Sequence, residues 1–340
     1  MTEPLLSIRN LDVTFGRGER ETRAVDGVSY DVEAGKIVGV VGESGSGKSV
    51  TSLAVMGLLP KRGCRTAGEI LFDGKNLLGR SDAELSKIRG KEIAMVFQDP
   101  MSSLNPVVPV GTQVTEVLRT HEQMSAAAAK DEAGELLKRC GIPDPQRRLK
   151  EYPHQLSGGM RQRAMIAIAL ACKPRLLICD EPTTALDVTI QAQVLELLSE
   201  LVADLGTAMI MITHDLGVVA GLCDHVNVMY AGRIVESAPR RELFAHPQHR
   251  YTQGLLNSIP RLDHPRGAPL RPIPGTPRDT VAWGKACAFA PRCHHVTDEC
   301  VTGGIELEEL STGHQVRCVH PATRQETQAD GSAAVAEEVR

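Results

Sequence analysis

The sequence has few aromatic side chains and no excess of positive charge. One Trp, four Tyr and five Phe are spread over 340 residues, too few for the stacking platforms that bind single-stranded nucleic acid. Lys and Arg number 38 against 42 Asp and Glu, so the net charge is −4. A protein that holds nucleic acid over much of its surface carries a positive excess. We therefore expect no nucleic-acid partner.

Long apolar runs are missing as well. The longest, at residues 164–172, has nine residues, less than half of the roughly 20 that a membrane-spanning helix requires. The amino terminus has no basic stretch followed by an apolar one, so we expect no secretory signal and a chain that starts in the cytoplasm. Contact with a membrane would then pass through a partner.

The composition is that of a folded protein, with 42% hydrophobic and 24% charged residues, which excludes a wholly disordered chain. The continuous apolar run at residues 37–41 indicates a strand covered on both faces, and helical spacing follows at residues 49–59. This alternation of strand and helix signals predicts an α/β fold with a parallel sheet. Further strands are predicted at residues 69–72, 93–97, 176–179, 208–213 and 225–230.

The character of the sequence changes twice along the chain. Residues 99–160 have a helical composition without a strand signal and predict a helical subdomain inserted into the core. Six prolines between residues 260 and 277 indicate a linker or an extended wrap. We therefore predict a core domain at residues 1–238, an extension at 239–322 that contains the proline-rich wrap and a group of cysteines, and a disordered tail at 323–340.

A glycine-rich loop stands between the strand at residues 37–41 and the helix that follows it. Gly42-Glu-Ser-Gly-Ser-Gly-Lys48-Ser49 fits the pattern G-x-x-x-x-G-K-[ST] in the strand, loop and helix context that the pattern requires. Successive N–H groups of such a loop point at a phosphate, and the helix N-terminus adds positive potential. Lys48 would reach the β- and γ-phosphates of ATP, and Ser49 would coordinate Mg²⁺. The residues expected to bind the nucleotide here are Gly42, Ser44, Gly45, Ser46, Gly47, Lys48 and Ser49.

Two acids end the apolar run at residues 176–179. Asp180 suits the Mg²⁺ shell, and Glu181 beside it could polarise the attacking water. On its own such a pair is more often a solvated strand end, but the phosphate loop in the same chain favours the catalytic interpretation. A second anion-binding nest is predicted where Ser157, Gly158 and Gly159 open a helix. One nucleotide already has its loop, so the second nest is expected to complete a site in another subunit.

With these motifs in this order, the chain resembles the ATP-binding subunits of ABC transporters. Residues 156–160, Leu-Ser-Gly-Gly-Met, are similar to that family's signature, although Met160 stands where glutamine is usual. The resemblance implies a P-loop NTPase core that closes head to tail with a second ATPase over two ATP molecules. It also implies that Gln98 contacts Mg²⁺ or water, Asp187 lies in the loop that crosses the dimer interface, and His214 holds the γ-phosphate. Phe15 would stack on adenine, although a core role fits it nearly as well.

Segments at residues 98–106, 251–260, 273–277 and 287–293 resemble the dipeptide and oligopeptide importer branch. This resemblance implies ATP-driven peptide import at the cytoplasmic face of the membrane, with a related second ATPase as heterodimer partner, two permease subunits and an extracytoplasmic substrate-binding protein. Nickel importers carry near-identical motifs, so nickel is the alternative cargo. A non-transport ABC ATPase is less favoured, because long coiled-coil or basic inserts are missing. A regulatory ATP-binding module is disfavoured, because Glu181 and His214 are both present.

Four of the nine cysteines fall within the last 54 residues: Cys287, Cys293, Cys300 and Cys318. Disulfides are not expected in a cytosolic chain, and the spacing lacks the C-x₂₋₄-C pattern of structural zinc sites. Iron–sulfur clusters can be held by cysteines that are farther apart in the sequence, and the resemblance to the importer branch also favours a [4Fe–4S] cluster. Zinc and unligated thiols are the alternatives, and neighbouring histidines leave a mixed ligand set open. We expect a metal centre here to order the extension separately from the ATP site.

Overall fold

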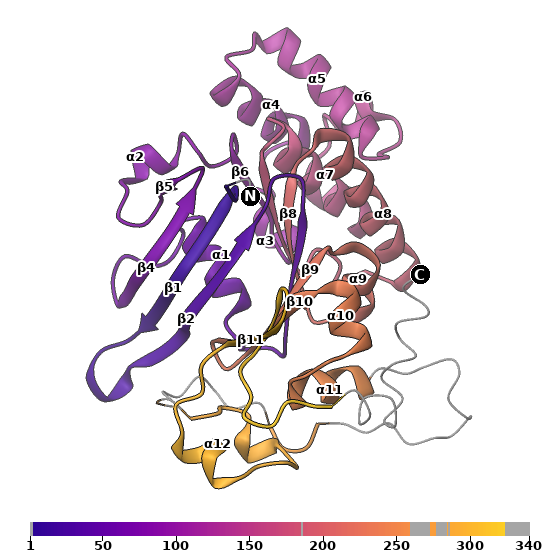
Figure 1. Cartoon of the computed structure of the whole chain (residues 1–340). Helices are drawn as coiled ribbons and strands as arrows, with labels where there is room; N and C mark the ends of the chain where they lie inside the picture. The colour runs from indigo at the N-terminus through magenta and orange to yellow at the C-terminus, as the bar shows by residue number, and fades with distance from the viewer. Residues whose placement is uncertain (1–2, 185, 259–272, 277–283, 285, 324–340) are drawn as a thin grey trace. The chain divides into compact units, whose positions relative to one another are not determined.

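A computed structural model describes residues 3–184, 186–258, 273–276, 284 and 286–323 (Figure 1). The chain forms two compact units. The first unit comprises Met1–Leu6, Val32–Ile37 and Leu71–Ile212, and the second comprises Ser7–Asp31, Val38–Ile70 and Thr213–Arg340. Both units therefore draw on distant parts of the sequence.

The first unit contains a parallel sheet made of β6 (Ile93–Val96), β7 (Leu176–Asp180) and β8 (Ala208–Thr213). In register, Ile93 pairs with Leu176, and Leu176 pairs with Ala208. Every residue of these strands is buried, as the continuous apolar runs require of strands covered on both faces. Their bounds agree with the predicted strands to within one residue. The parallel sheet confirms the predicted α/β class.

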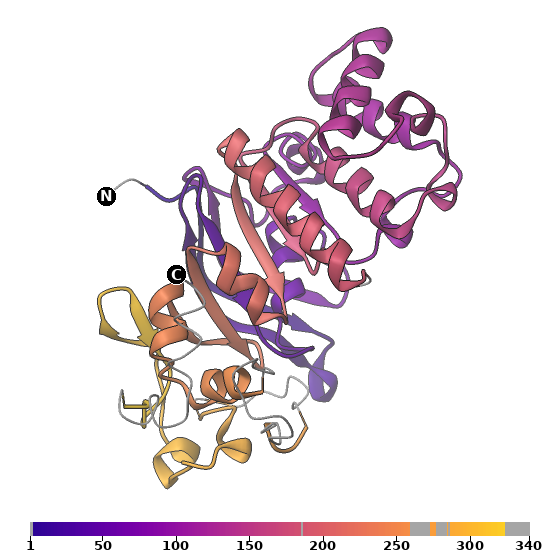
Figure 2. The same ribbon diagram turned by 90° about the vertical axis from the view of Figure 1, so that its right-hand side faces the viewer.

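The residues that connect β6 to β7 are all described, and they form helices without a strand. Figure 2 shows α4, α5 and α6 gathered at one end of this unit. Side-chain caps begin the longer helices: Ser125 accepts from Ala128 N–H, and Asp187 accepts from Ile190 N–H. The helices of the first unit are α2 (Asp82–Leu85), α3 (Pro100–Ser103), α4 (Val110–His121), α5 (Ala126–Arg139), α6 (Pro145–Arg148), α7 (Gly158–Leu170) and α8 (Val188–Leu205), with the 3₁₀ turn η2 (Pro153–Gln155).

The second unit is built around β3 (Ile37–Val41), which runs parallel to β9 (His225–Tyr230). β9 continues into the antiparallel strand β10 (Arg233–Pro239). β3 leads into α1 (Lys48–Val55). α9 (Leu216–Leu222) packs so closely on β3 at Gly39 that a side chain would not fit there. The unit also includes β1 (Leu6–Phe15), η1 (Gly18–Arg20), β2 (Thr22–Val32) and most of β4 (Cys64–Phe72), whose last residues pair with β5 (Lys75–Asn76) in the first unit.

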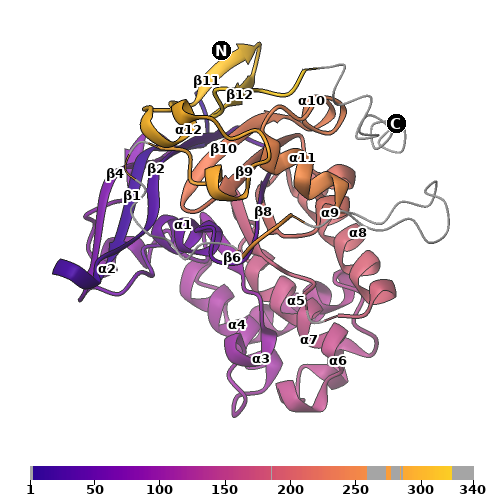
Figure 3. The same cartoon turned by 90° about the horizontal axis from the view of Figure 1, so that it is seen from below.

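Short elements of the extension add strands to the second unit. β12 (His314–Val316) pairs antiparallel with β10, and β11 (Glu308–Ser311) pairs with β12. Figure 3 shows this hairpin and α12 (Asp298–Thr302) beside β10. No strand was predicted here, because three or four residues are too short to show an alternating pattern. The extension also forms α10 (Arg240–Ala245), α11 (Arg250–Asn257) and the 3₁₀ turn η3 (Ala290–Arg292).

A buried carboxylate fastens this extension to β10. Glu236 has no solvent exposure. It accepts hydrogen bonds from Gln248 N–H at 2.7 Å, His249 N–H at 2.9 Å and His314 Nε2 at 2.8 Å. These partners belong to the segment before α11 and to β12. An unpaired buried carboxylate costs several kcal/mol, so Glu236 strongly favours the docked arrangement.

Some predictions fall outside the described residues. The disordered tail lies there except for residue 323, and so does most of the proline-rich wrap. The division at residues 238 and 322 stays a prediction, since the two compact units follow other boundaries. Among the described helices, none combines the length and the apolar character that a membrane crossing requires.

Replacing Gly39 by alanine tests the packing of β3 against α9. An added Cβ would lie 2.9 Å from Val219 Cγ1 and 3.0 Å from Cys223 Sγ. We expect Gly39→Ala to lower the free energy of unfolding by about 1–3 kcal/mol, measured by urea denaturation. Gly221 in α9 is the matched control, because an added Cβ there meets nothing within 4 Å. Equal losses in the two variants would contradict the packing argument.

Candidate functional site

The glycine-rich loop joins β3 to α1, as predicted. Lys48, the first residue of α1, is 5% exposed. Its Nζ donates to Gly42 O at 2.7 Å and to Glu43 O at 2.9 Å, and it lies 3.4 Å from Ser46 Oγ. These contacts hold the ammonium group against the loop backbone. The loop and helix thus form an anion-binding cradle with a fixed cation.

Gly42 occupies a position that only glycine fits. Its φ is +153°, and an added Cβ would lie 2.1 Å from Met229 O in β9. A side chain would therefore force the start of the loop away from the neighbouring strand. The close approach of the two backbones explains why the loop begins with glycine.

Glu43, the second residue of the loop, is held at each of its polar groups. Its N–H donates to Tyr251 Oη at 2.9 Å, and its carbonyl accepts from Ser46 N–H at 3.2 Å as well as from Lys48. Its carboxylate receives two hydrogen bonds from Arg292, at 2.6 Å and 3.1 Å. No motif in the sequence assigned a role to Glu43, Tyr251 or Arg292, although the last two lie in segments that resemble the importer branch.

Aromatic rings surround the Arg292 guanidinium. Arg292 is 7% exposed, and its Cζ lies 5.8 Å from the ring centroid of Tyr230 and 6.0 Å from that of Phe289. Tyr230 contacts both Tyr251 and Phe289 edge to face. The hydrogen bond to Glu43 is the main reason that the pKa of Arg292 is raised. The expectation that the cysteine segment lies apart from the phosphate loop is therefore wrong, because Arg292 of that segment binds the loop directly.

The carboxyl end of β7 carries the predicted acids in the first unit. Asp180 is buried, and Glu181 follows it with φ +47°, an uncommon conformation for a residue with a side chain. Glu181 Oε2 accepts from Gln98 Nε2 at 3.0 Å and from Thr184 Oγ1 at 2.9 Å. The structure thus brings together Gln98 and Glu181, which lie 83 residues apart in the sequence.

The predicted signature segment opens α7 in the same unit. Ser157 Oγ accepts from Met160 N–H at 3.3 Å and caps the helix. Ser157 and Gly158 are exposed, and an added Cβ at Gly159 would lie 2.9 Å from Ile190 Cγ2 of α8. Asp187 caps α8. These residues form one exposed surface at the N-termini of two packed helices.

The remaining predicted residues lie in the second unit. His214 is exposed and directly follows β8, and Phe15 is half-buried at the end of β1. The phosphate loop lies in this unit too, whereas Gln98, Asp180, Glu181 and the signature belong to the first. The predicted nucleotide residues are thus divided between the two units.

The four late cysteines line one pocket, together with side chains that include His249, His295 and His320. None of them forms a disulfide. The N–H group of His295 donates to Cys293 Sγ at 3.4 Å. Such N–H groups stabilise a thiolate.

Burial opposes ionisation of the Cys287, Cys293 and Cys318 thiols. It raises the pKa of Cys287 and Cys293 and raises that of Cys318 to about 11. A metal centre would reverse this, since a coordinating thiol is deprotonated. Within the described part of the chain, no group of three or more His, Cys, Asp or Glu side chains is arranged to hold a metal ion. The described residues therefore bear out neither the predicted iron–sulfur cluster nor the zinc alternative.

Comparison with known proteins gives consistent matches. Residues 25–184 match the family described as ABC transporter, and residues 235–300 match the oligopeptide/dipeptide transporter C-terminal region. The oligopeptide transport ATP-binding protein OppD of Escherichia coli is 49% identical over 319 residues, which cover 94% of each chain. The dipeptide transport ATP-binding protein DppD of Bacillus subtilis is 54% identical over 319 residues, or 93% of this chain and 94% of that protein.

A solved structure matches the fold. The dimeric ATP-binding cassette MJ0796, in a post-hydrolysis state with ADP and Pi, aligns with a TM-score of 0.62 at 29% identity. The alignment covers 69% of this chain and 98% of that one. This likeness agrees with the predicted P-loop core.

Replacing Gly42 tests the geometry of the loop. We expect Gly42→Ala to lower the free energy of unfolding by about 1–3 kcal/mol and to weaken binding of a fluorescent ATP analogue, because the loop must leave β9. Gly63→Ala is the control, since Gly63 also has a positive φ but an added Cβ there meets nothing within 4 Å. Unchanged nucleotide affinity in Gly42→Ala would show that the loop tolerates the displacement.

Proposed function

The chain belongs to the ATP-binding proteins of the ABC transporter family, in the oligopeptide/dipeptide branch, and we propose that it hydrolyses ATP to energise peptide import. The observation that carries the ATPase proposal is the buried Lys48 fixed on the backbone of a loop between strand and helix. The peptide cargo is supported by relatives named for oligopeptide and dipeptide transport, which match more than nine-tenths of the chain.

In the proposed site the loop N–H groups, from Gly42 to Ser49, bind the phosphates, and Lys48 neutralises the β- and γ-phosphates. Ser49, Asp180 and Gln98 are the side chains that would hold Mg²⁺, which supplies charge neutralisation during phosphoryl transfer. Asp180 suits this role because its carboxylate stands, buried, at the end of β7.

Glu181 is proposed to orient the attacking water. Gln98 and Thr184 both donate to Glu181 Oε2, so the carboxylate is held at the end of β7, where it could act on a water molecule. His214 is proposed to contact the γ-phosphate and Phe15 to stack on adenine. Both roles are assigned because these residues match positions of the ABC transporter family.

The signature surface is proposed to act on the nucleotide of a second ATPase subunit. Ser157, Gly158 and Gly159 lie at the start of α7, with Ser157 and Gly158 exposed, and the helix dipole there favours an anion. Asp187 lies beside them at the start of α8. Two subunits arranged head to tail would each complete the other's site, and we propose a related second ATPase as the partner.

The membrane part of the transporter is proposed to consist of two permease subunits, supplied with peptide by an extracytoplasmic binding protein. The chain would then sit at the cytoplasmic face of the membrane, held by the permeases. The relatives compared above are named for peptides, so the peptide cargo is favoured over nickel. The match of residues 235–300 to a transporter region likewise favours transport over a non-transport ATPase.

Glu181→Gln tests the catalytic assignment. We expect ATP hydrolysis to fall about 100-fold or more while ATP affinity stays near that of the unmodified chain, because the amide keeps the shape but cannot orient water as a base. The measurement is phosphate release by the complex reconstituted with its permeases and binding protein, with uptake of a labelled tripeptide and of nickel followed in parallel.

The exposed Glu200 of α8 provides the matched control, and Glu200→Gln should leave hydrolysis unchanged. Hydrolysis near the normal rate in Glu181→Gln would remove Glu181 from the proposed mechanism. Uptake of nickel instead of the tripeptide would overturn the proposed cargo.

We also propose that Cys287, Cys293, Cys300 and Cys318 hold a [4Fe–4S] cluster. The support is their common pocket and the N–H group of His295, which donates to Cys293 Sγ. Four thiolates bound to four different irons do not converge on one point, so the lack of a single-ion site among the described residues counts against zinc more than against a cluster.

Metal analysis tests this proposal. Chain purified without oxygen should contain about four iron and four acid-labile sulfide per molecule, and Cys293→Ser should lose both. Cys64→Ser is the control, because Cys64 is a free cysteine outside the pocket. Stoichiometric zinc, or ordered protein without metal, would refute the cluster.

A further inference from the structure

Arg292 joins the cysteine segment to the phosphate loop. It immediately precedes Cys293 in the sequence, and its guanidinium makes a bidentate contact with Glu43 across 249 residues. The same side chain donates from Nε to Pro274 O at 2.8 Å. Arg292 is nearly fully buried, and the aromatic rings around it limit its freedom to turn. The contact is therefore a fixed part of the fold rather than an exposed ion pair of small effect.

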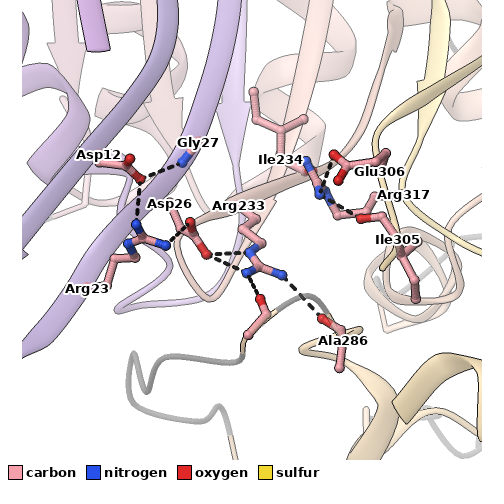
Figure 4. A network of polar contacts seen from close by, with 11 residues as sticks. Asp12, Arg23, Asp26, Gly27, Arg233, Ile234, Ala286, Ile305, Glu306 and Arg317 are labelled. Carbon is pink, nitrogen blue, oxygen red and sulfur yellow. Dashed lines mark hydrogen bonds and ion pairs between the residues drawn. The ribbon is translucent and has the colours of Figure 1, made fainter. Parts of the chain in front are cut away.

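A second set of contacts, made by Arg233 and its neighbour Gly232, also joins the extension to the phosphate loop. Arg233 pairs with Asp26 through Nε at 2.6 Å, and its other nitrogens donate to Gly284 O and to Ala286 O of the extension (Figure 4). The residue before it, Gly232, donates its N–H to Ser46 O of the phosphate loop at 3.0 Å. The segment before Cys287 is thus linked to the phosphate loop a second time, through the neighbouring residues Arg233 and Gly232.

Another arginine directly before a cysteine makes a similar link. Arg317 precedes Cys318 and donates to Ile234 O at 3.2 Å and to Ile305 O at 2.8 Å (Figure 4). Ile234 follows Arg233 in β10. Cys293 and Cys318 are therefore each preceded by an arginine that bonds to the part of the unit carrying the loop.

We propose that Arg292 is a positioning residue for the phosphate loop, through which the four-cysteine segment sets the affinity for ATP. This inference rests on the proposed ATPase function. Arg292 acts through Glu43, whose backbone carbonyl binds Lys48.

Two physical effects make the contact important for an anion site. A glycine-rich loop is flexible, and ordering it at the moment of binding would cost affinity, so a loop ordered beforehand binds more tightly. Arg292 also neutralises a carboxylate in the loop that binds phosphate. Without Arg292 the Glu43 charge would repel the triphosphate.

The test measures the affinity of the full chain for a fluorescent ATP analogue. We expect Arg292→Gln to weaken binding about tenfold, within the range of coupling between contacting residues, and Arg292→Lys to weaken it less because the charge is kept. The double variant Arg292→Gln with Glu43→Gln should be no weaker than Arg292→Gln alone. Arg241→Gln is the matched control, since Arg241 is exposed on α10.

Hydrogen exchange of residues 42–49 supplies a readout that does not depend on nucleotide. We expect faster exchange in Arg292→Gln than in the unmodified chain, with overall secondary structure unchanged. Normal affinity together with normal exchange in Arg292→Gln would overturn the proposal. A chain that binds no ATP even unmodified, or whose affinity does not fall in Lys48→Ala, would instead overturn the proposed function.

The role of the cysteine segment is tested in two backgrounds. Cys293→Ser should weaken ATP binding several-fold in the otherwise unmodified chain, in the same range of coupling, and should have little further effect in Arg292→Gln. Cys64→Ser is the control in both. An equal loss from Cys293→Ser in the two backgrounds would show that the segment does not act through Arg292, and no loss in either would show that it does not set the affinity.

Discussion

The hydrogen bonds of the buried Glu236 carboxylate hold the extension on β10, and the structure of the second unit depends on them. Glu236 has no solvent exposure, and its hydrogen bonds reach the start of α11 and the strand β12. Taking a carboxylate out of water is costly unless its acceptor sites are filled. The segments that fill them belong to the extension, so β10 and the extension stabilise each other. The cysteine pocket and Arg292 lie in the same extension.

The residues of the phosphate loop and the strands that flank it could be predicted from local sequence. The run at residues 37–41 is apolar without alternation, and it forms a buried parallel strand. Glycine and lysine spacing identified the loop because a phosphate cradle demands particular residues at particular positions. The contact between Gln98 and Glu181 was different. No local pattern connects residues so far apart, and only the family resemblance put them in one site.

The contacts of Arg292 could not be predicted in the same way. Glu43 and Arg292 are separated by 249 residues, and Glu43 and Tyr251 by 208. Each side chain is ordinary in its local sequence, and the pairing exists only in the folded second unit. The strands β11 and β12 were missed for a related reason, since β12 has three residues and owes its strand conformation to the edge of β10.

The contacts around the phosphate loop answer two opposing requirements on the loop, which must contain glycine and must also be ordered. The loop must contain glycines so that its N–H groups can point at phosphate, yet glycine gives the backbone the most freedom to lose. Rigidity must then come from outside the loop. In this chain Met229 O packs closely against Gly42, and Gly232 N–H donates to Ser46 O. Tyr251 and Arg292 form hydrogen bonds with Glu43. Three of the ten aromatic residues stand around that last contact, where they exclude water and strengthen the ion pair. The neighbouring β9–β10 segment and the extension therefore together supply order that the loop sequence cannot provide for itself.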